Sequence, residues 1–475
     1  MARHIAALSA AAAALSLAAC SMAPDYKPPQ TAAPAQFKEV AGWTGATPRD
    51  DEARGAWWSA FDDPVLADLE QRAAAASPTL AAALARYDAA RAAARVNEAD
   101  LYPEVGVSGD VSRERLSRGR PLSTGTARKY DDYVVGGSIA YELDLWGRIR
   151  NQVKASQAEA QASRADLASA QLSLQASVAD AYFRLRGFDA QAQLLDRSVD
   201  AFARAYDLTA KRRSGGIASG IDVNRARTVL GNARAQVATV ANQRAATEHE
   251  IAALVGELAT DFSLPADVRP LDPPAVPAST PSELLQRRPD IAAAERRVFA
   301  ANAGIGVARA AFFPSLTLGA TGGWETTGGS LLTTPNTFWA LGPLTSLLTI
   351  FDGGRRAAQV KISRAQYEEV AADYRGTVLG AFRQVEDSIA AIHHLSDASV
   401  AQKEAADAAQ RTSEIAMSRY RDGASGYLDV VTAQTDALEA QRAYLSVQTQ
   451  RMQASVELVR ALGGGLPTVP VARTR

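Results

Sequence analysis

Apolar and polar positions alternate with a period of two in two stretches of the chain, about 103–146 and about 314–352. One face of the earlier stretch carries small and apolar residues, namely Val105, Val107, Gly109 and Val111, then every odd position from Tyr133 to Leu145. The opposite face carries Gly136, Ser138, Glu142 and Asp144. This pattern is typical of a membrane barrel strand, with apolar residues toward lipid. A soluble hairpin with one buried face alternates in the same way, so both interpretations stay open.

The later stretch repeats the alternation with Leu316, Leu318 and Ala320, followed by TFWALGPLTSLLTIF at 337–351. Pro343 weakens the last strand, because proline has no N–H group to donate to a ladder. The pattern therefore predicts two hairpins, which supply four strands per chain.

Helical periodicity dominates the remaining sequence, with no proline between Pro121 and Pro265 or between Pro343 and Pro467. One apolar stripe has steps of four and three throughout: Leu174, Val178, Ala181, Leu185, Phe188, Ala192, Leu195, Val199, Phe202, Tyr206 and Thr209. Its mean spacing of about 3.5 residues predicts a left-handed coiled coil. A matching stripe is less regular: Val378, Phe382, Val385, Ile389 and Ile392 begin it, and Ser399 and Gln402 dilute it.

These stripes predict two long helices, 148–213 and 356–421, and two return helices, 222–256 and 429–462. A continuous helix over the first range spans roughly 100 Å. No compact domain encloses such a rod, so it must belong to a tube, fibre or bundle.

The same plan occurs twice. SPTLAAALARYDAARAAARVNEADLYPEV at 77–105 matches RPDIAAAERRVFAANAGIGVARAAFFPSL at 288–316, and Gly256 matches Gly463 at nearly the same offset. Repeat 1 (61–260) and repeat 2 (283–465) each contain a helix, two strands and two helices. A proline-rich linker, 261–282, joins them, and 466–475 forms a C-terminal tail.

Each long helix is followed by a similar turn, GGIASGIDV at 215–223 and DGASGYLDV at 422–430. Gly216 and Gly423 can adopt the left-handed conformation that ends a helix. Ser219 or the following aspartate can cap the next helix, where a carboxylate also suits the positive end of the helix dipole.

The N-terminus has the composition of a secretory leader. Arg3 and His4 precede the apolar run IAALSAAAAALSLAA, which is too short for a spanning helix. We predict a signal peptide at 1–19, and a lipid-anchored segment at 20–60 that begins at Cys20, the single cysteine. LAAC at 17–20 resembles a bacterial lipobox, whose cysteine carries a covalent diacylglycerol and acyl lipid. The alternative is an ordinary leader with an incidental thiol.

Charge and composition exclude several classes of function. The formal net charge of −1 lacks the basic excess of a nucleic-acid binder. None of the four histidines has ligand spacing with a second histidine or a cysteine, so no metal site and no further cofactor is expected. No nucleophile, base and orienting group form a recognisable set, which predicts that the chain is not an enzyme.

Several motifs together carry a family resemblance. The lipobox leads into PDYKPP, WWSAFDDPVLADL at 57–69 opens the first copy, and each copy has a proline after its first helix and GR after its hairpin. Almost the whole mature chain thus resembles the TolC-like outer-membrane efflux protein family, in its lipoprotein branch. The resemblance implies a mainly α fold with membrane β: a homotrimer with one twelve-stranded β-barrel and a long α-helical coiled-coil tunnel in the periplasm. Independently, four strands are too few to close a barrel, and lipid forbids open edges.

The resemblance also implies a function. The chain would be the outer-membrane exit duct of a tripartite efflux system that exports small molecules. Its partners would be a periplasmic adaptor (membrane fusion) protein, an inner-membrane transporter of the resistance-nodulation-division type, and outer-membrane lipid. The alternatives are an exit duct for type I protein secretion and a structural coiled-coil lipoprotein that tethers the envelope.

In this family, residues of the two turns form the closed periplasmic gate. The spacing from the glycines places these roles on Asp222, Asp429 and Tyr420. Some members also have an arginine before the second aspartate and an aspartate after it. This chain has Ser425 and Thr432 there, so a full salt-bridge latch is not expected.

Overall fold

The computed structural model describes residues 21–29, 55–117, 119, 129–270, 272–274 and 288–464. The signal peptide, Cys20 and the C-terminal tail of the sequence analysis lie outside these ranges. The chain divides into two compact units. Unit 1 takes the described residues of Met1–Gln30, Arg86–Arg164 and Ala293–Arg375, and unit 2 those of Thr31–Ala85, Ala165–Ala292 and Gly376–Arg475.

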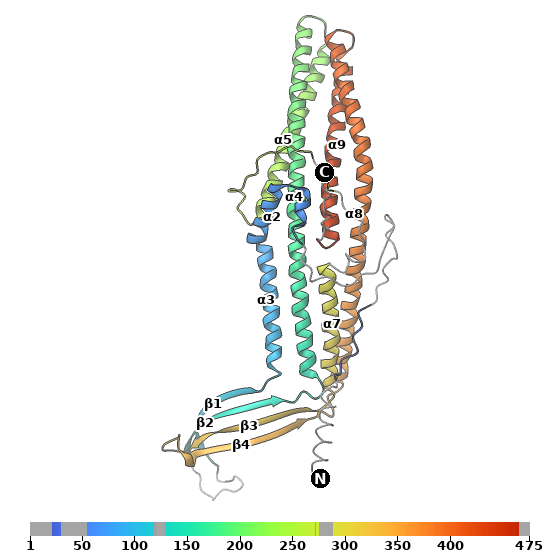
Figure 1. Ribbon diagram of the computed structural model, residues 1–475. Coiled ribbons are helices and arrows are strands. Elements are labelled where there is room, and N and C mark those ends of the chain that lie inside the picture. The colour runs from blue at the N-terminus through green and yellow to red at the C-terminus, as the bar shows by residue number, and fades with distance from the viewer. Residues whose placement is uncertain are drawn as a thin grey trace, which may run out of the picture. The chain divides into compact units, whose positions relative to one another are not determined.

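Unit 1 contains one antiparallel sheet of the four expected strands (Figure 1). They are β1 (Glu104–Arg115), β2 (Lys129–Glu142), β3 (Ser315–Thr326) and β4 (Thr337–Leu347), paired in that order. Thus β2 of the first hairpin pairs with β3 of the second. β1 and β4 are the edges, and each has a single neighbouring strand within the described residues.

The register gathers the predicted apolar positions on one face of the sheet. Val107 lies opposite Gly137, which lies opposite Gly322, and that glycine lies opposite Trp339. Large apolar side chains of this face are exposed on the chain: Val105, Val107, Val111, Ile139, Leu318, Trp339, Leu341 and Leu344. The β3–β4 register shifts between Leu318 and Ala320, opposite the stretch that contains Pro343, where the missing N–H interrupts the ladder.

Both long helices begin at a carboxylate cap directly after a hairpin. For α4 (Arg148–Ser214), Asp144 accepts hydrogen bonds from the backbone N–H groups of Ile149 and Arg150. For α8 (Arg355–Arg421), Asp352 accepts from the N–H groups of Gly354 and Arg356. Capping satisfies donors that have no partner inside the helix, so both copies join strand to helix by the same chemistry.

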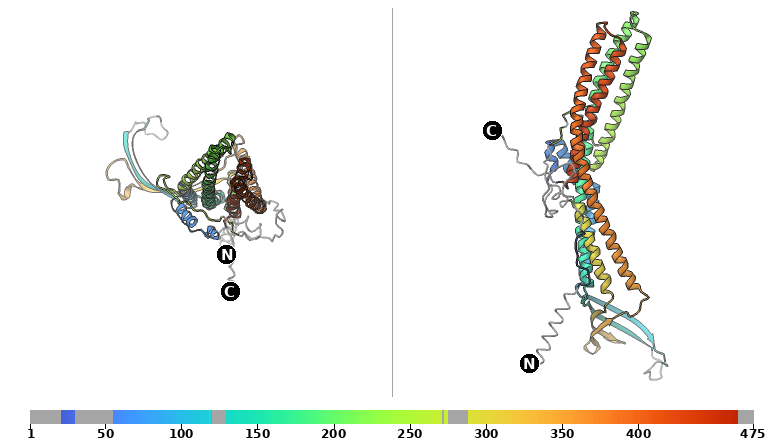
Figure 2. Two further views of the ribbon diagram at one scale, coloured as in Figure 1. Left: turned by 90° about the horizontal axis from the view of Figure 1, so that it is seen from above. Right: turned by 90° about the vertical axis from the view of Figure 1, so that its right-hand side faces the viewer.

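Unit 2 contains the rest of α4 and α8 together with α5 (Gly220–Leu254), α9 (Tyr427–Ala461), α2 (Pro64–Ala76) and the short η1 (Trp57–Phe61). The predicted stripe on α4 is buried or half-buried throughout. Its members pack with α5 and α9 in two apolar clusters. Seen along the helices, the green pair α4–α5 stands beside the red-orange pair α8–α9 (Figure 2). In the described chain, no helix combines the length and apolarity needed to cross a bilayer.

The structure differs from the sequence-based boundaries at two kinds of position. Repeat 1 has two helices before its strands instead of one, α2 and α3 (Pro78–Ala99). The break falls at Ser77, which is extended, because a residue before proline disfavours the α conformation. The return helices begin at Gly220 and Tyr427, earlier than predicted, because the caps are Ser219 and Gly426.

A buried ion cluster in unit 2 fixes the start of the linker. The carboxylate of Asp189 accepts from Arg186 (2.7 Å), Arg244 (2.7 Å) and the backbone N–H of Asp267 (3.1 Å). Each arginine also donates to a linker carbonyl, of Pro265 and Leu264 respectively. The described linker residues, 261–270 and 272–274, form no helix or strand.

Candidate functional site: the two helix-tip turns

Tip turn 1 (residues 215–219) connects α4 to α5. Gly216 has φ +79°, and the N–H groups of Gly216 and Ile217 donate to the carbonyls of Arg213 and Arg212, at 3.0 and 2.8 Å. Ser219 Oγ accepts from Asp222 N at 3.1 Å, and the Asp222 carboxylate accepts from Ser219 N at 3.2 Å. This reciprocal pair is a capping box. The structure thus confirms the left-handed glycine and assigns the cap to Ser219.

Tip turn 2 (residues 422–426) connects α8 to α9 with the same backbone but a different cap. Gly423 also has φ +79°, and Ala424 N donates to Arg419 O at 2.8 Å. The N-cap is Gly426, without a side-chain cap bond. Asp429 is exposed and has no hydrogen bond or ion pair within the described residues, and Ser425 Oγ is buried without a partner. The second aspartate is therefore not held by its own turn.

Tyr420 packs between the two tips inside one chain. Its side chain is 3% exposed, and its hydroxyl lies 3.1 Å from Thr209 Oγ1. Because the Thr209 hydroxyl proton is donated to the Ala205 carbonyl at 2.8 Å, Tyr420 is the donor in this pair. The Tyr427 ring lies 5.6 Å away in an edge-on arrangement.

Arg212 makes a second link between the tips. Its guanidinium lies 4.3 Å from the centre of the Tyr420 ring, and Nη2 donates to the Arg421 carbonyl at 3.1 Å. A cation over an aromatic face is attractive, so Arg212 adds two contacts to the Thr209 pair, and α4 holds the end of α8 by three contacts. The spacing of the two turns predicted Tyr420, whereas Thr209 and Arg212 belong to no motif and are recognised only by their contacts.

The three predicted gate residues lie in one region but in different settings. Asp222 is half-buried in its capping box, Asp429 is exposed and Tyr420 is buried. Burial, with Tyr420 and Asp222 nearby, raises the pKa of Tyr427 to about 12. Asp222 of the first tip therefore acts electrostatically on a ring of the second tip.

A short extended segment follows the predicted lipid attachment site. Residues 21–29, here called the strap, lie along α7 (Pro289–Ala310) in unit 1. Arg309 donates to the Met22 carbonyl (3.3 Å), Asn302 donates to the Pro24 carbonyl (2.9 Å), and Tyr26 donates to Glu295. The strap thus runs antiparallel to α7.

The beginning of the strap lies at the sheet end of unit 1. Ser21 Oγ donates to Asn151 Oδ1 (3.0 Å), in the first turn of α4 after β2. A Cβ atom on Gly306 would come within 2.8 Å of Ala23, so the strap sits close against the helix backbone. Cys20 lies outside the described residues, but the residue after it is held by the first turn of α4, the helix that follows β2.

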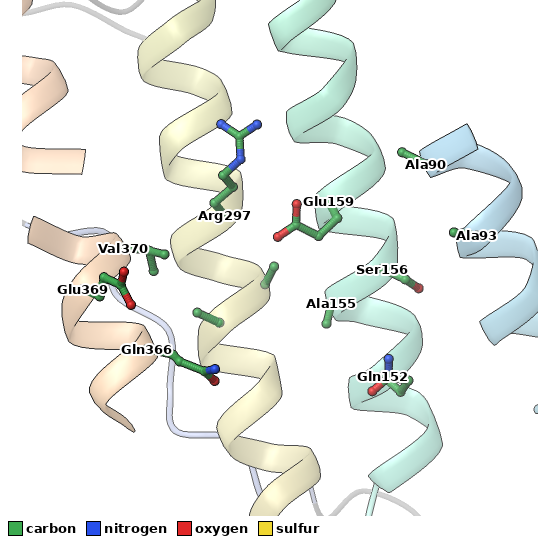
Figure 3. A pocket seen from close by; sticks show the side chains of 12 residues that line it. Ala90, Ala93, Gln152, Ala155, Ser156, Glu159, Arg297, Gln366, Glu369 and Val370 are labelled. Carbon is green, nitrogen blue, oxygen red and sulfur yellow. The ribbon is translucent and has the colours of Figure 1, made fainter. Parts of the chain in front are cut away.

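We identify no catalytic set in the remaining polar clusters of the described residues. A cleft of about 550 Å³ in unit 1 is lined by residues of α3, α4, α7 and α8, including Glu159, Arg297 and Glu369 (Figure 3). Ser156 also lines the cleft, but its Oγ donates to the Val153 carbonyl at 3.0 Å and not to a side-chain base. On α8, possible ligand atoms of His393, His394 and Asp397 lie within 4.8 Å of one another. All three side chains are exposed, so no buried cavity favours an ion, and we assign no metal to them.

Comparison with known proteins agrees with this arrangement. The family model for Outer membrane efflux protein matches residues 69–257 and 280–464, once per repeat. The toluene efflux pump outer membrane protein TtgC of Pseudomonas putida is 34% identical over 468 residues, which cover 96% of this chain and 95% of that one. The pyoverdine export outer membrane protein OpmQ of Pseudomonas aeruginosa is 34% identical and covers 96% of each.

A solved structure of the outer-membrane channel OprN superposes with a TM-score of 0.87 and 30% identity. The match covers 94% of this chain and 100% of that chain. The similarity thus extends over both repeats and almost the whole chain. The chain belongs to the outer membrane efflux protein family.

Proposed function

We propose that this outer-membrane efflux channel works as a homotrimer, the exit duct of a tripartite pump. The observation that carries the proposal is the open sheet of unit 1. Its edges, β1 and β4, each have one neighbour in the described chain, and an open edge in lipid leaves backbone groups without partners. Three copies give twelve strands, enough to close a barrel whose apolar face meets lipid.

The partners we propose are a periplasmic adaptor and an inner-membrane transporter of the resistance-nodulation-division type. A duct in the outer membrane has no energy source of its own, so a pump must supply cargo. The relatives TtgC and OpmQ are named as components of a toluene efflux pump and of pyoverdine export. Their names support small molecules over secreted proteins as cargo. A tethering lipoprotein would not need the two membrane hairpins.

We also propose a lipid anchor on Cys20. The strap supports it, because Ser21 is held by Asn151 in the first turn of α4, the helix that directly follows the hairpin of β1 and β2. The test is mass spectrometry of the N-terminal peptide of membrane-extracted protein. An unmodified thiol, or a leader still attached, would remove the anchor from the proposal.

Asp222, Asp429 and Tyr420 are proposed to form the gate at the periplasmic end. In a trimer the two aspartates place six carboxylates around the opening, which favours cations. The links from Thr209 and Arg212 to Tyr420 hold the two helix pairs of one chain together, so opening would separate these contacts. Because Asp429 is exposed and has no ion-pair partner among the described residues, its negative charge can attract cations at the opening.

Single-channel recording in a planar bilayer tests both duct and gate. The parent protein is expected to run as a heat-resistant trimer and to form cation-preferring channels. Asp222→Ala with Asp429→Ala should raise conductance and reduce cation preference. Asp196→Ala, an exposed charge on α4 far from both tip turns, is the matched control and should change neither. A monomer without channel activity would reject the duct, and an unchanged double variant would reject the gate.

A further inference from the structure

The helix α2 connects three parts of unit 2. At its start, the Asp63 carboxylate accepts a hydrogen bond from the Tyr182 hydroxyl of α4 at 2.6 Å, and Arg269 of the linker lies 3.4 Å away. Near its end, Arg72 Nε donates to Glu257, which follows α5, at 3.0 Å. The docking of α2 therefore determines how firmly α4, the end of α5 and the linker are held together.

One buried residue interrupts the apolar face by which α2 docks. Leu66, Leu69 and Ala73 belong to the apolar cluster that α2 shares with α4, α5 and α9. Glu70 is also buried, at 1% exposed, and neither of its carboxyl oxygens has a hydrogen-bond partner among the described residues. Burial of an unpaired carboxylate costs far more than burial of the neutral acid, so this position favours the protonated form.

The charged groups of the neighbouring elements contact one another or solvent instead of Glu70. Those on α4, α5 and α9 form these pairs: Arg184 with Asp180 and Glu250, Arg186 with Asp189, Arg244 with Glu248, and Arg460 with Glu457. Further groups on or beside these elements are exposed: Asp62, Asp68, His249 and Asp261. Burial is thus the single cause that raises the pKa of Glu70, from the ordinary value of 4.5 to about 9.

We propose that the docking of α2 depends on the proton of Glu70, so that α2 binds the long helices more tightly in acid and less tightly toward alkaline pH. This device goes beyond the proposed duct and rests on the packing inside one unit. It would adjust how firmly the pair α4–α5 is held to the linker, at a distance from the gate.

The direction follows from the two states of the carboxyl group. Docked α2 keeps the proton up to about pH 9, whereas a released α2 exposes Glu70 to water, where it ionises above about pH 4.5. Release therefore frees a proton between these two values, and rising pH favours release. The docking constant is largest below about pH 4.5 and falls by up to about tenfold per pH unit through neutral pH.

Hydrogen exchange of the α2 peptides, followed by mass spectrometry, measures this equilibrium in the full-length protein extracted from the membrane. Protection at about pH 5.5 and about pH 8 is compared after correction for the intrinsic pH dependence of exchange. Glu70→Gln keeps the size of the side chain and removes the ionisation. Asp68→Asn is the matched control, because Asp68 is an exposed carboxylate on the same helix, in a surface ion pair with Arg72.

In the parent and in Asp68→Asn, protection of α2 should fall from the lower to the higher pH, by up to about tenfold per pH unit. In Glu70→Gln it should stay level. Level protection in the parent, an equal fall in Glu70→Gln, or loss of the fall in Asp68→Asn would each overturn the proposal.

Two further measurements keep the test specific. Glu70→Leu completes the apolar face without a titratable group, so it repeats the test if Glu70→Gln does not fold, and its protection should be level and higher than that of the parent at about pH 8. The start of α5, which Ser219 caps, is the internal reference and should show no fall. A parallel fall there would indicate unfolding of the whole unit and would overturn a device confined to α2.

Discussion

The two helix tips share a backbone and differ in every side chain that determines how tightly they are held. Both have a glycine at φ +79° and an aspartate at the third position of the return helix. Tip 1 has the serine cap, and the exposed Arg213 stands near Gly220, about 3.7 Å from the Cβ position of that glycine. At the equivalent positions, tip 2 has Gly426 in place of Ser219, Tyr420 in place of Arg213, and Tyr427 in place of Gly220. Tip 1 is therefore fixed by local hydrogen bonds, and tip 2 by burial against its neighbour.

This difference has a mechanistic consequence. A capping box does not depend on other helices, so tip 1 keeps its form when the helix pairs move apart. The rings of Tyr420 and Tyr427 belong to a cluster with Ala205 and Ala226 of the first pair, so tip 2 loses contacts in that movement. We expect the second tip to be the region that changes when the duct opens.

The largest expected effect comes from Tyr420→Ala. Truncating a buried aromatic side chain costs about 3–5 kcal/mol, and this change also removes the links to Thr209 and Arg212. Arg213→Ala, at the equivalent exposed position of tip 1, should stay within about 0.5 kcal/mol. Hydrogen exchange of the first turns of α5 and α9 measures both. Equal loss of protection in the two variants would abolish the distinction between the tips.

Gly216→Ala and Gly423→Ala should destabilise their turns by similar amounts, unlike the substitutions at Tyr420 and Arg213. Each imposes a left-handed conformation on an L-residue, at about 1–2 kcal/mol, and neither glycine has an atom within 4 Å of the added Cβ. Local stability from hydrogen exchange again provides the comparison. A clearly larger effect at one glycine would show that its turn is further constrained in the trimer.

Exchanging the caps should partly convert one tip into the other. Ser219→Ala removes the serine cap and should destabilise the start of α5 by about 1 kcal/mol. Gly426→Ser creates the Ser-x-x-Asp spacing before Asp429 and should stabilise α9 by a few tenths of a kcal/mol. If Asp429 then turns into its own cap, cation preference in single-channel recording should fall. Unchanged protection of α9 together with unchanged preference would contradict this.

The smallest effect concerns Tyr427 and arises only at high pH. Its pKa is raised from the ordinary value of 10.0 to about 12, so the unfolded chain releases this proton first. Stability from this group is intact below about pH 10 and is lost between pH 10 and about 12. Tyr427→Phe removes the ionisation and should reduce the alkaline loss by less than about 1 kcal/mol at about pH 10.5. A larger alkaline loss in Tyr427→Phe than in the parent would reverse the predicted sign.

Much of the fold was predictable because its strands and helices follow the spacing of apolar residues along the chain. The alternation through Val105 and Val107 predicted the strands, and the stripe from Leu174 predicted the buried face of α4. The break at Ser77 was missed, although Pro78 disfavours a helical residue before it. That signal is local and could have been read. The weakening of β4 at Pro343 was also predicted, because proline has no N–H group to donate to the neighbouring strand.

The candidate site divides in the same way. Gly216 and Gly423 were predictable, because the left-handed conformation is a property of the residue type. The partners of Tyr420 were not, because Thr209 and Arg212 lie far from it in the sequence and match no motif. The strap contacts at Asn302 and Arg309 were equally hidden. Glu70 of α2 was also not predictable. Burial raises its pKa to about 9, and neither carboxylate oxygen has a hydrogen-bond partner among the described residues. The sequence of its own helix does not indicate this burial.

By itself, the sequence determined the duplication, the four strands, the paired long helices and the turns between them, because these follow from side-chain periodicity and from what glycine and proline allow the backbone to do. The tertiary structure alone decided which aspartate is held by a cap and which is exposed, how Tyr420 joins the tips, and which faces of α7 meet the strap and the cleft. Those features depend on distances between segments remote in the chain. Local propensity carries no information about such distances, which only packing sets.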